Sequence, residues 1–292
     1  MSDVRHLMAG TATQAEAPPR AVAVLHGDPR ANPSISTHEL LSRLRIARDE
    51  AEKAVLMKDL SELEAPQVVA FLNQHAVNLA WEHRELWSDL GAADVLLRDG
   101  IGVKTVLRWM GREPGLNLNG TDLIPEILAV YEGRPVAVYG TSSPWLEAAT
   151  QSVAESGCIV VSAMDGFHSD IVYLDDAREH RPALILLGMG MPKQERVARL
   201  LRAQLIDPTL IVCGGAVLDF IGGRVVRAPL WVRRADLEWL FRLVHEPTRL
   251  WSRYGPGGVR FLVRMRRIAA LEAMASAAAA TEPPSPPAGS TP

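Results

Sequence analysis

The segment Gly188–Glu195 carries the residues of this chain that are best suited to chemistry. It reads Gly-Met-Gly-Met-Pro-Lys-Gln-Glu and follows an apolar run, Ala183–Leu187, that predicts a buried strand. A helical pattern follows the glycine turn. Free backbone N–H groups and the helix dipole make such a junction a natural anion site, and Lys193 would add a positive charge. A nucleotide diphosphate is the predicted ligand. The predicted contacts are Gly188, Gly190, Lys193, Gln194 and Glu195.

Asp99 is the residue that could act as a base. It follows the predicted strand Asp94–Leu97 and precedes Gly100 in the sequence Asp-Gly-Ile-Gly. A carboxylate at a strand end, held by a glycine turn, can reach into a cleft and take a proton from a hydroxyl nucleophile. The alternative is that Asp99 caps a helix beginning near Val103, and spacing alone favours this cap.

Two further turns carry small polar residues. The turn Gly140–Ser143 follows the predicted strand Val136–Tyr139, and the segment Asn119–Asp122 precedes an apolar helical pattern. Both turns suit contact with a phosphate or sugar, and both suit ordinary helix capping, so the residues leave these alternatives open. The candidate binding residues in them are Asn119, Thr121, Asp122, Gly140, Thr141 and Ser142.

A nicotinamide cofactor and a metal ion are both disfavoured. The segment Gly188–Gly190 begins like a dinucleotide fingerprint, but Lys193 replaces its third glycine, and no acid ends the strand Leu210–Cys213 to bind a ribose. The chain has no Asp-x-Asp pair for a divalent metal and no cysteine–histidine cluster with zinc spacing. We therefore expect no cofactor and no metal, with Lys193, arginines and backbone amides stabilising the diphosphate.

Alternating strand and helix patterns predict the fold that positions these turns. The predicted strands are Val68–Leu72, Asp94–Leu97, Val136–Tyr139, Ile159–Ser162, Ala183–Leu187 and Leu210–Cys213, and the predicted helices include Ala76–Leu90, Pro144–Glu155, Gln194–Gln204 and one from the capping box Ser36–Glu39 through Glu52. This order predicts an α/β fold with a mostly parallel sheet and helices on both faces. Ligands bind such sheets beyond the carboxyl ends of the strands, where these polar turns fall.

Composition divides the 292 residues into four parts. Polar residues 1–20 predict a flexible tail, 21–222 the α/β core, 223–270 a basic amphipathic appendage and 271–292 a disordered tail. The net charge of −3 does not reveal that the appendage is positively charged. In it, arginines alternate with tryptophan and leucine. That pattern suits an anionic membrane surface. Two cysteines in apolar runs, and the lack of a signal peptide or a long apolar run, lead us to expect a cytoplasmic protein peripheral to the membrane.

The order of the motifs resembles the WecG/TagA/CpsF glycosyltransferases, glycosyltransferase family 26. The resemblance runs from about residue 65 to about residue 254. Its specific segments are Pro192–Glu195, Arg227–Pro229 and Glu238–Leu240, supported by Asp99–Gly102, Gly214–Asp219 and Glu246–Arg249. It adds Asn73, Gly214, Asp219 and Arg227 to the candidate substrate-binding residues.

The resemblance implies an inverting, metal-independent enzyme with a Rossmann-like fold of the GT-E type. Such an enzyme transfers N-acetylmannosamine, its uronic acid or another hexose from a UDP-sugar to a polyprenyl-diphosphate-linked saccharide at the inner face of the cytoplasmic membrane. It also implies Asp99 as the base and a C-terminal appendage whose arginines close the site and touch the membrane. The family often has a threonine shortly before Asn73, where this chain has Phe71 or Leu72, so a hydroxyl contact to the donor would be absent or replaced.

A different class of function stays open: a non-catalytic nucleotide- or nucleic-acid-binding module with a basic tail. It predicts no turnover and a strong salt dependence of RNA or DNA binding. The basic region is rich in tryptophan and leucine and holds no known nucleic-acid motif, so we expect no nucleic-acid partner. A homo-oligomer is left open.

Overall fold

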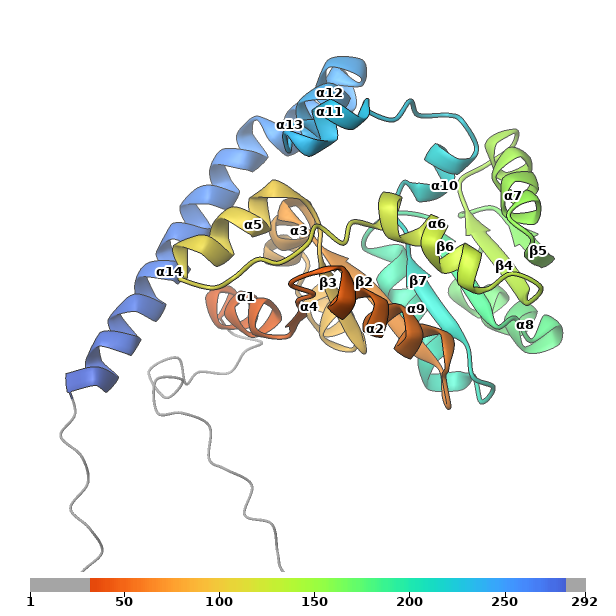
Figure 1. Cartoon of the computed structure of the whole chain (residues 1–292), viewed down its shortest axis with the longest axis horizontal. Helices are drawn as coiled ribbons and strands as arrows, with labels where there is room; N and C mark the ends of the chain where they lie inside the picture. Colours follow the sequence, from red (N-terminus) through yellow and green to blue (C-terminus); the bar gives the residue numbers. More distant parts are fainter. Residues whose placement is uncertain (1–31, 282–292) are drawn as a thin grey trace, which may run out of the picture.

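The protein is built on one parallel β-sheet. The computed structural model describes residues 32–281, so the predicted flexible segment 1–20 lies outside it. Within the described residues, seven strands pair in the order β1-β3-β2-β7-β6-β4-β5, every neighbouring pair parallel (Figure 1). The strands are β1 (Leu44–Arg45), β2 (Gln67–Leu72), β3 (Val95–Arg98), β4 (Pro135–Gly140), β5 (Ile159–Met164), β6 (Leu184–Gly188) and β7 (Leu210–Cys213). The predicted α/β fold is confirmed, and only the two-residue strand β1 was not expected.

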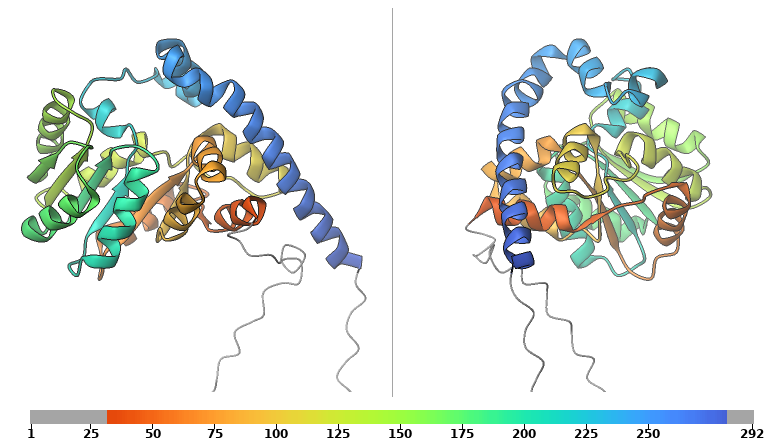
Figure 2. Two further views of the ribbon diagram at one scale, coloured as in Figure 1. Left: turned by 180° about the vertical axis from the view of Figure 1, so that it is seen from behind. Right: turned by 60° about the vertical axis from the view of Figure 1, so that its left-hand side comes forward.

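Helices cover both faces of the sheet, as Figures 1 and 2 show. Alternate residues of one strand face opposite ways, so Ala70 and Leu72 pack in one core while Val69 and Phe71 pack in the other. The core helices are α1 (Pro33–Ser42), α2 (Glu50–Ser61), α3 (Gln74–Glu82), α4 (Arg84–Gly91), α5 (Gly100–Trp109), α6 (Gly120–Val130), α7 (Trp145–Glu155), α8 (Asp170–His180), α9 (Lys193–Gln204) and α10 (Val217–Ile221). Both cysteines are buried and unpaired, as expected.

Two predicted helices are wrong in their limits. The helix expected from Ser36–Glu39 through Glu52 is two helices: Asn32 caps α1, and Asp49 accepts a hydrogen bond from the Glu52 N–H at the start of α2. Pairing of Leu44 with Leu96 in the sheet separates them. The helix expected over Ala76–Leu90 breaks at His83, whose backbone is extended. Its apolar spacing continues across the break, so periodicity could not reveal it.

The C-terminal region returns to the carboxyl edge of the sheet. After α10 the chain forms the short helices α11 (Leu230–Arg234), α12 (Glu238–His245) and α13 (Pro247–Tyr254), and then the long helix α14 (Pro256–Thr281). Helix α14 runs along the side of the domain (Figure 2), beside α5 and α3. Its residues Phe261, Met265 and Ile268 are buried. It continues beyond residue 270, where the appendage was expected to end. Among residues 32–281, no helix combines the length and apolar character that a membrane span requires.

Candidate active site

Two cavities meet at the carboxyl edge of the sheet, within the part of the chain that the structure describes. We call the first the glycine-loop cavity, of about 370 Å³, because Gly188, Gly190 and Gly214 line it. We call the second the α5–α12 cavity, of about 470 Å³; it is lined by the start of α5 and by residues of α12, α13 and α14. The residues that line both are Asn73, His75, Asp99, Thr121, Arg242 and Arg253.

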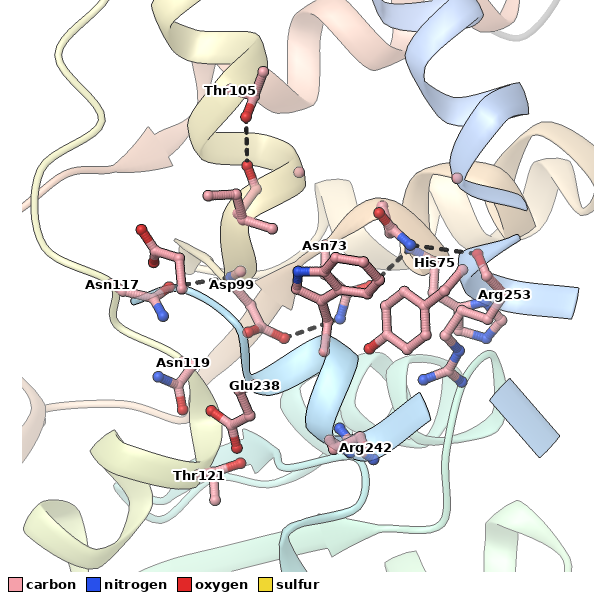
Figure 3. A pocket seen from close by; sticks show the side chains of 18 of the residues that line it. Asn73, His75, Asp99, Thr105, Asn117, Asn119, Thr121, Glu238, Arg242 and Arg253 are labelled. Atoms are coloured by element: carbon pink, nitrogen blue, oxygen red, sulfur yellow. Dashed lines mark hydrogen bonds between the residues drawn. The ribbon is translucent and has the colours of Figure 1, made fainter. Parts of the chain in front are cut away.

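Asp99 lies at this junction. It occupies the position before α5, yet its side chain makes no capping hydrogen bond, so the capping alternative does not describe it. Its Oδ2 instead accepts a hydrogen bond from Asn73 Nδ2 at 3.0 Å (Figure 3). The Asn73 oxygen accepts from the N–H groups of His75 and Ala76 at the start of α3, which fixes the amide so that its nitrogen faces Asp99. The predicted base is therefore held by another predicted site residue.

Positive charge from the C-terminal helices reaches Asp99. Burial raises the pKa of the Asp99 carboxyl, and the Asn73 hydrogen bond and the charges of Arg242, Arg98 and Arg253 oppose that rise. Figure 3 shows Arg242 and Arg253 in the pocket with Asp99. Burial, with the charge of Arg253, lowers the pKa of His75 to about 4, so this imidazole is neutral near pH 7.

Sequence reasoning missed several of these lining residues. It expected arginines from the appendage but could not select Arg242 and Arg253, and it gave no role to His75 or Glu238. Burial raises the pKa of the Glu238 carboxyl. The Glu-Trp-Leu motif at Glu238–Leu240 was the one local signal that could have pointed to Glu238. His75, Arg242 and Arg253 lie in helices, and the sequence of a helix does not show which residues of other elements its side chains face.

The glycine-loop cavity contains much of the predicted diphosphate site. Thr141 and Ser142 line it, and Thr141 Oγ1 donates to Asp219 Oδ1 at 2.7 Å. Gly140 does not line it; a Cβ there would lie 2.3 Å from the Gly188 carbonyl carbon, so this glycine lets the ends of β4 and β6 approach. The glycines thus serve close backbone packing as well as access to the cavity.

Lys193 and Gln194 of the Pro-Lys-Gln-Glu motif form hydrogen bonds with the backbone of neighbouring loops. The Lys193 ammonium donates to the carbonyl oxygens of Gly166 at 2.7 Å and His168 at 2.6 Å, and the residue lines neither cavity. Gln194 lines the glycine-loop cavity, and its Oε1 accepts from the Gly215 N–H at 3.0 Å. Buried Glu195 accepts from Gln194 Nε2 at 2.8 Å and also lines neither cavity. Lys193 and Glu195 therefore lie outside both cavities, and their expected contacts with a ligand stay predictions.

Asp122 and Arg227 form a tether between the core and the appendage. Asp122 Oδ1 accepts hydrogen bonds from Arg227 and, at 2.9 Å, from Arg233. Although burial acts to raise it, the hydrogen bonds from Asn119 and Arg227 hold the pKa of Asp122 below its usual value. Asp122 and Arg227 line neither cavity, whereas Asn119, Thr121, Gly100 and Arg233 line the α5–α12 cavity. Within residues 32–281, no group of three or more histidines, cysteines or acids could hold a metal ion.

Comparison with known proteins identifies the family. The model of the glycosyl transferase WecG/TagA/CpsF family matches residues 41–273. The chain belongs to this family. This confirms the resemblance predicted from the motifs.

Two curated relatives are similar to part of the glycosyltransferase chain. Over 192 residues, it is 27% identical to the N-acetylglucosaminyldiphosphoundecaprenol N-acetyl-beta-D-mannosaminyltransferase of Bacillus subtilis (strain 168), covering 64% of this chain and 74% of the relative. Over 169 residues, it is 29% identical to the protein of the same name from Bacillus spizizenii (strain ATCC 23059 / NRRL B-14472 / W23), covering 56% of this chain and 65% of the relative.

Proposed function

We propose that this glycosyltransferase is an inverting, metal-independent enzyme that acts on a polyprenyl-diphosphate-linked saccharide. The donor is a UDP-sugar that carries N-acetylmannosamine, its uronic acid or another hexose. The observation that carries the proposal is the position of Asp99 at the junction of two cavities, where a donor and an acceptor could meet. The relatives' names, which specify a diphosphoundecaprenol-linked N-acetylglucosamine acceptor, support the acceptor class.

The glycine-loop cavity would hold the UDP part of the donor. Its backbone amides and the hydroxyls of Thr141 and Ser142 suit phosphate and ribose oxygens. Arg224, Arg242 and Arg253 also line it and would neutralise the diphosphate. The Lys193 ammonium already donates to two backbone carbonyls. These arginines would therefore supply the positive charge near the diphosphate that the sequence suggested for Lys193.

The α5–α12 cavity would hold the acceptor sugar. Trp239 and Tyr254 line it, with ring centroids 5.7 Å apart, and such rings offer apolar faces for the C–H face of a sugar. Val259 and Leu262 of α14 line the same cavity and are exposed. They would extend the apolar surface toward the polyprenyl chain.

The proposed reaction is one displacement. The Asp99 carboxylate takes the proton from an acceptor hydroxyl while that oxygen attacks the anomeric carbon of the donor. The bond from this carbon to the UDP oxygen breaks, UDP leaves with the electron pair, and the configuration inverts. A raised Asp99 pKa makes the carboxylate a better proton acceptor, and the arginines stabilise charge on the leaving UDP.

A panel of UDP-sugars with a polyprenyl-diphosphate-linked acceptor tests this function. UDP release should require both a donor and the acceptor, and it should continue in the presence of a metal chelator. NMR should show that the product has the inverted anomeric configuration. Asp99→Asn should lower kcat by about 10²–10⁴ while UDP affinity and the circular dichroism spectrum stay unchanged. A folded Asp99→Asn variant with near-full kcat would show that Asp99 is not the base. No turnover with any donor would favour the non-catalytic module.

We also propose that helices α11–α13 rest on the inner face of the cytoplasmic membrane, where a polyprenyl-linked acceptor would lie. Trp231 is 71% exposed and Trp251 is 63% exposed. Exposed Arg234 stands on the same helical segment as Trp231. Exposed tryptophans with neighbouring arginines suit the boundary of an anionic bilayer.

A further inference from the structure

Arg98, the residue before Asp99, is a buried arginine at the end of a buried strand. It is 2% exposed, and within residues 32–281 it forms no ion pair. Burying an unpaired charge costs free energy unless hydrogen bonds satisfy it. The donors of Arg98 therefore need partners, and these partners decide what the residue does.

The guanidinium binds three backbone carbonyls that belong to two segments of the chain. Its Nε donates to the Pro114 carbonyl at 2.9 Å and its Nη2 to the Gly115 carbonyl at 3.0 Å. Its Nη1 donates to the Gly100 carbonyl at 3.2 Å and to Asn117 Oδ1 at 3.3 Å. Arg98 thereby connects the turn that carries Asp99 with the loop between α5 and α6.

The peptide groups next to Asp99 are held from both sides. Arg98 binds the Gly100 carbonyl, and Asn117 Oδ1 accepts from the Gly100 N–H at 3.1 Å. Gly100 has a φ of 83°, a left-handed conformation that favours glycine. The loop is itself fixed to the core, because the Leu116 N–H donates to the Ala47 carbonyl at 2.8 Å. Hydrogen bonds with Arg98 and Asn117 thus hold the Asp99–Gly100 turn in a single orientation.

Arg98 also acts on Asp99 through charge. The charged and titratable groups around the carboxyl are Arg98 on β3, Glu238 and Arg242 on α12, Arg253 and Tyr254 on α13, and neutral His75 on α3. Of the three arginines Arg98, Arg242 and Arg253, only Arg98 belongs to the sheet, so its place does not depend on the C-terminal helices.

We propose that Arg98 is the positioning residue of the base: it fixes the Asp99–Gly100 turn between the two cavities and supplies a sheet-borne positive charge that favours the carboxylate. This role rests on the proposed function of Asp99. Arg98 lines neither cavity, so it acts through Asp99 and not on the substrates.

Steady-state kinetics across pH tests the proposal with Arg98→Met and Arg98→Lys in the full chain. For Arg98→Met, kcat should fall by about 10- to 100-fold through misplacement of the base, with the donor KM within about twofold. The acid limb of kcat/KM should move up by about one pH unit, because a positive charge near the carboxylate is lost. Arg98→Lys should leave the acid limb in place and have a kcat between those of Arg98→Met and the wild type. Lysine keeps the positive charge but lacks the planar guanidinium that binds several acceptors at once.

Matched variants separate the outcomes. Arg43→Met removes an arginine that also binds two backbone carbonyls, Gly91 and Ala93, but lies away from both cavities, so it should leave kcat and the limb unchanged. A folded Arg98→Met with wild-type kcat and limb overturns the proposal, as does a loss of kcat with an unmoved limb. If Arg98→Met does not fold, Arg98→Lys decides: reduced kcat at an unmoved limb supports the proposal, and wild-type kcat overturns it. Asp99→Asn in the same assay reports separately on the base, because full activity there refutes the proposed function itself.

Discussion

Asp99, Asp122 and Glu195 are three carboxyls placed in three environments. Asp99 accepts one hydrogen bond from Asn73 at a cavity junction, Asp122 is bound by two arginines, and Glu195 is buried beside Gln194. The first environment leaves a carboxylate oxygen for a substrate proton, the second makes a tether, and the third favours a neutral acid. Residue type alone distinguishes none of these roles.

Glu195 gives a pH prediction at this scale. Burial raises its pKa from 4.5 to about 7, so the folded protein holds this proton more tightly than the unfolded chain. The stabilisation is present below about pH 4.5 and is lost as pH rises through about 7. Glu195→Gln should therefore flatten the fall in unfolding free energy over this range and raise stability near pH 8 by up to about 3 kcal/mol.

Chemical denaturation at a series of pH values measures this effect. Glu64→Gln, at an exposed position, serves as the control and should leave the pH dependence as it is in the wild type. An unchanged pH dependence in Glu195→Gln would contradict the assignment of a buried neutral acid.

At the scale of elements, α14 supports the helix that begins at Asp99. Phe261 of α14 is fully buried, and a Cβ placed on Gly102 of α5 would lie 3.2 Å from its ring. The glycine therefore allows the phenyl ring to approach α5 closely. Since α5 starts at the turn of the proposed base, α14 holds the site indirectly as well as lining the α5–α12 cavity.

Phe261→Ala should lower the free energy of unfolding by about 3–5 kcal/mol, because it leaves a cavity between α14 and α5. Val263→Ala on the same helix is the matched control; Val263 is 66% exposed, and its loss should cost no more than about 0.5 kcal/mol. Urea unfolding measures both variants. Equal costs would mean that α14 is not anchored to the domain through its buried face.

At the scale of the whole molecule, the exposed tryptophans of α11 and α13 lie on the side of the sheet where the strands end. Trp231→Ser with Trp251→Ser should weaken binding to vesicles with anionic lipid by at least about tenfold and leave the melting temperature unchanged, because both rings are already exposed. Co-sedimentation with phosphatidylglycerol-containing vesicles measures this, and the difference from binding to vesicles of phosphatidylcholine alone measures the electrostatic part.

Ile206→Ser provides the control for vesicle binding. Ile206 is 90% exposed but precedes β7, at the opposite edge of the sheet. This variant should bind vesicles as the wild type does. Equal weakening by both variants would mean that no particular face docks on the membrane.

Local patterns in the sequence determined the parallel sheet, its polar turns and the family. Apolar strand runs, helix spacing and glycine turns are set by neighbouring residues, so six of the seven strands could be placed in advance. The tertiary structure alone decided which side chains meet. Asn73, Asp99 and Arg242 come together through the strand order and the return of the C-terminal helices, and the charge of Lys193 is taken up by two distant carbonyls. Sequence showed that these groups exist, but a side chain's partners depend on long-range packing, and those partners decide its chemistry.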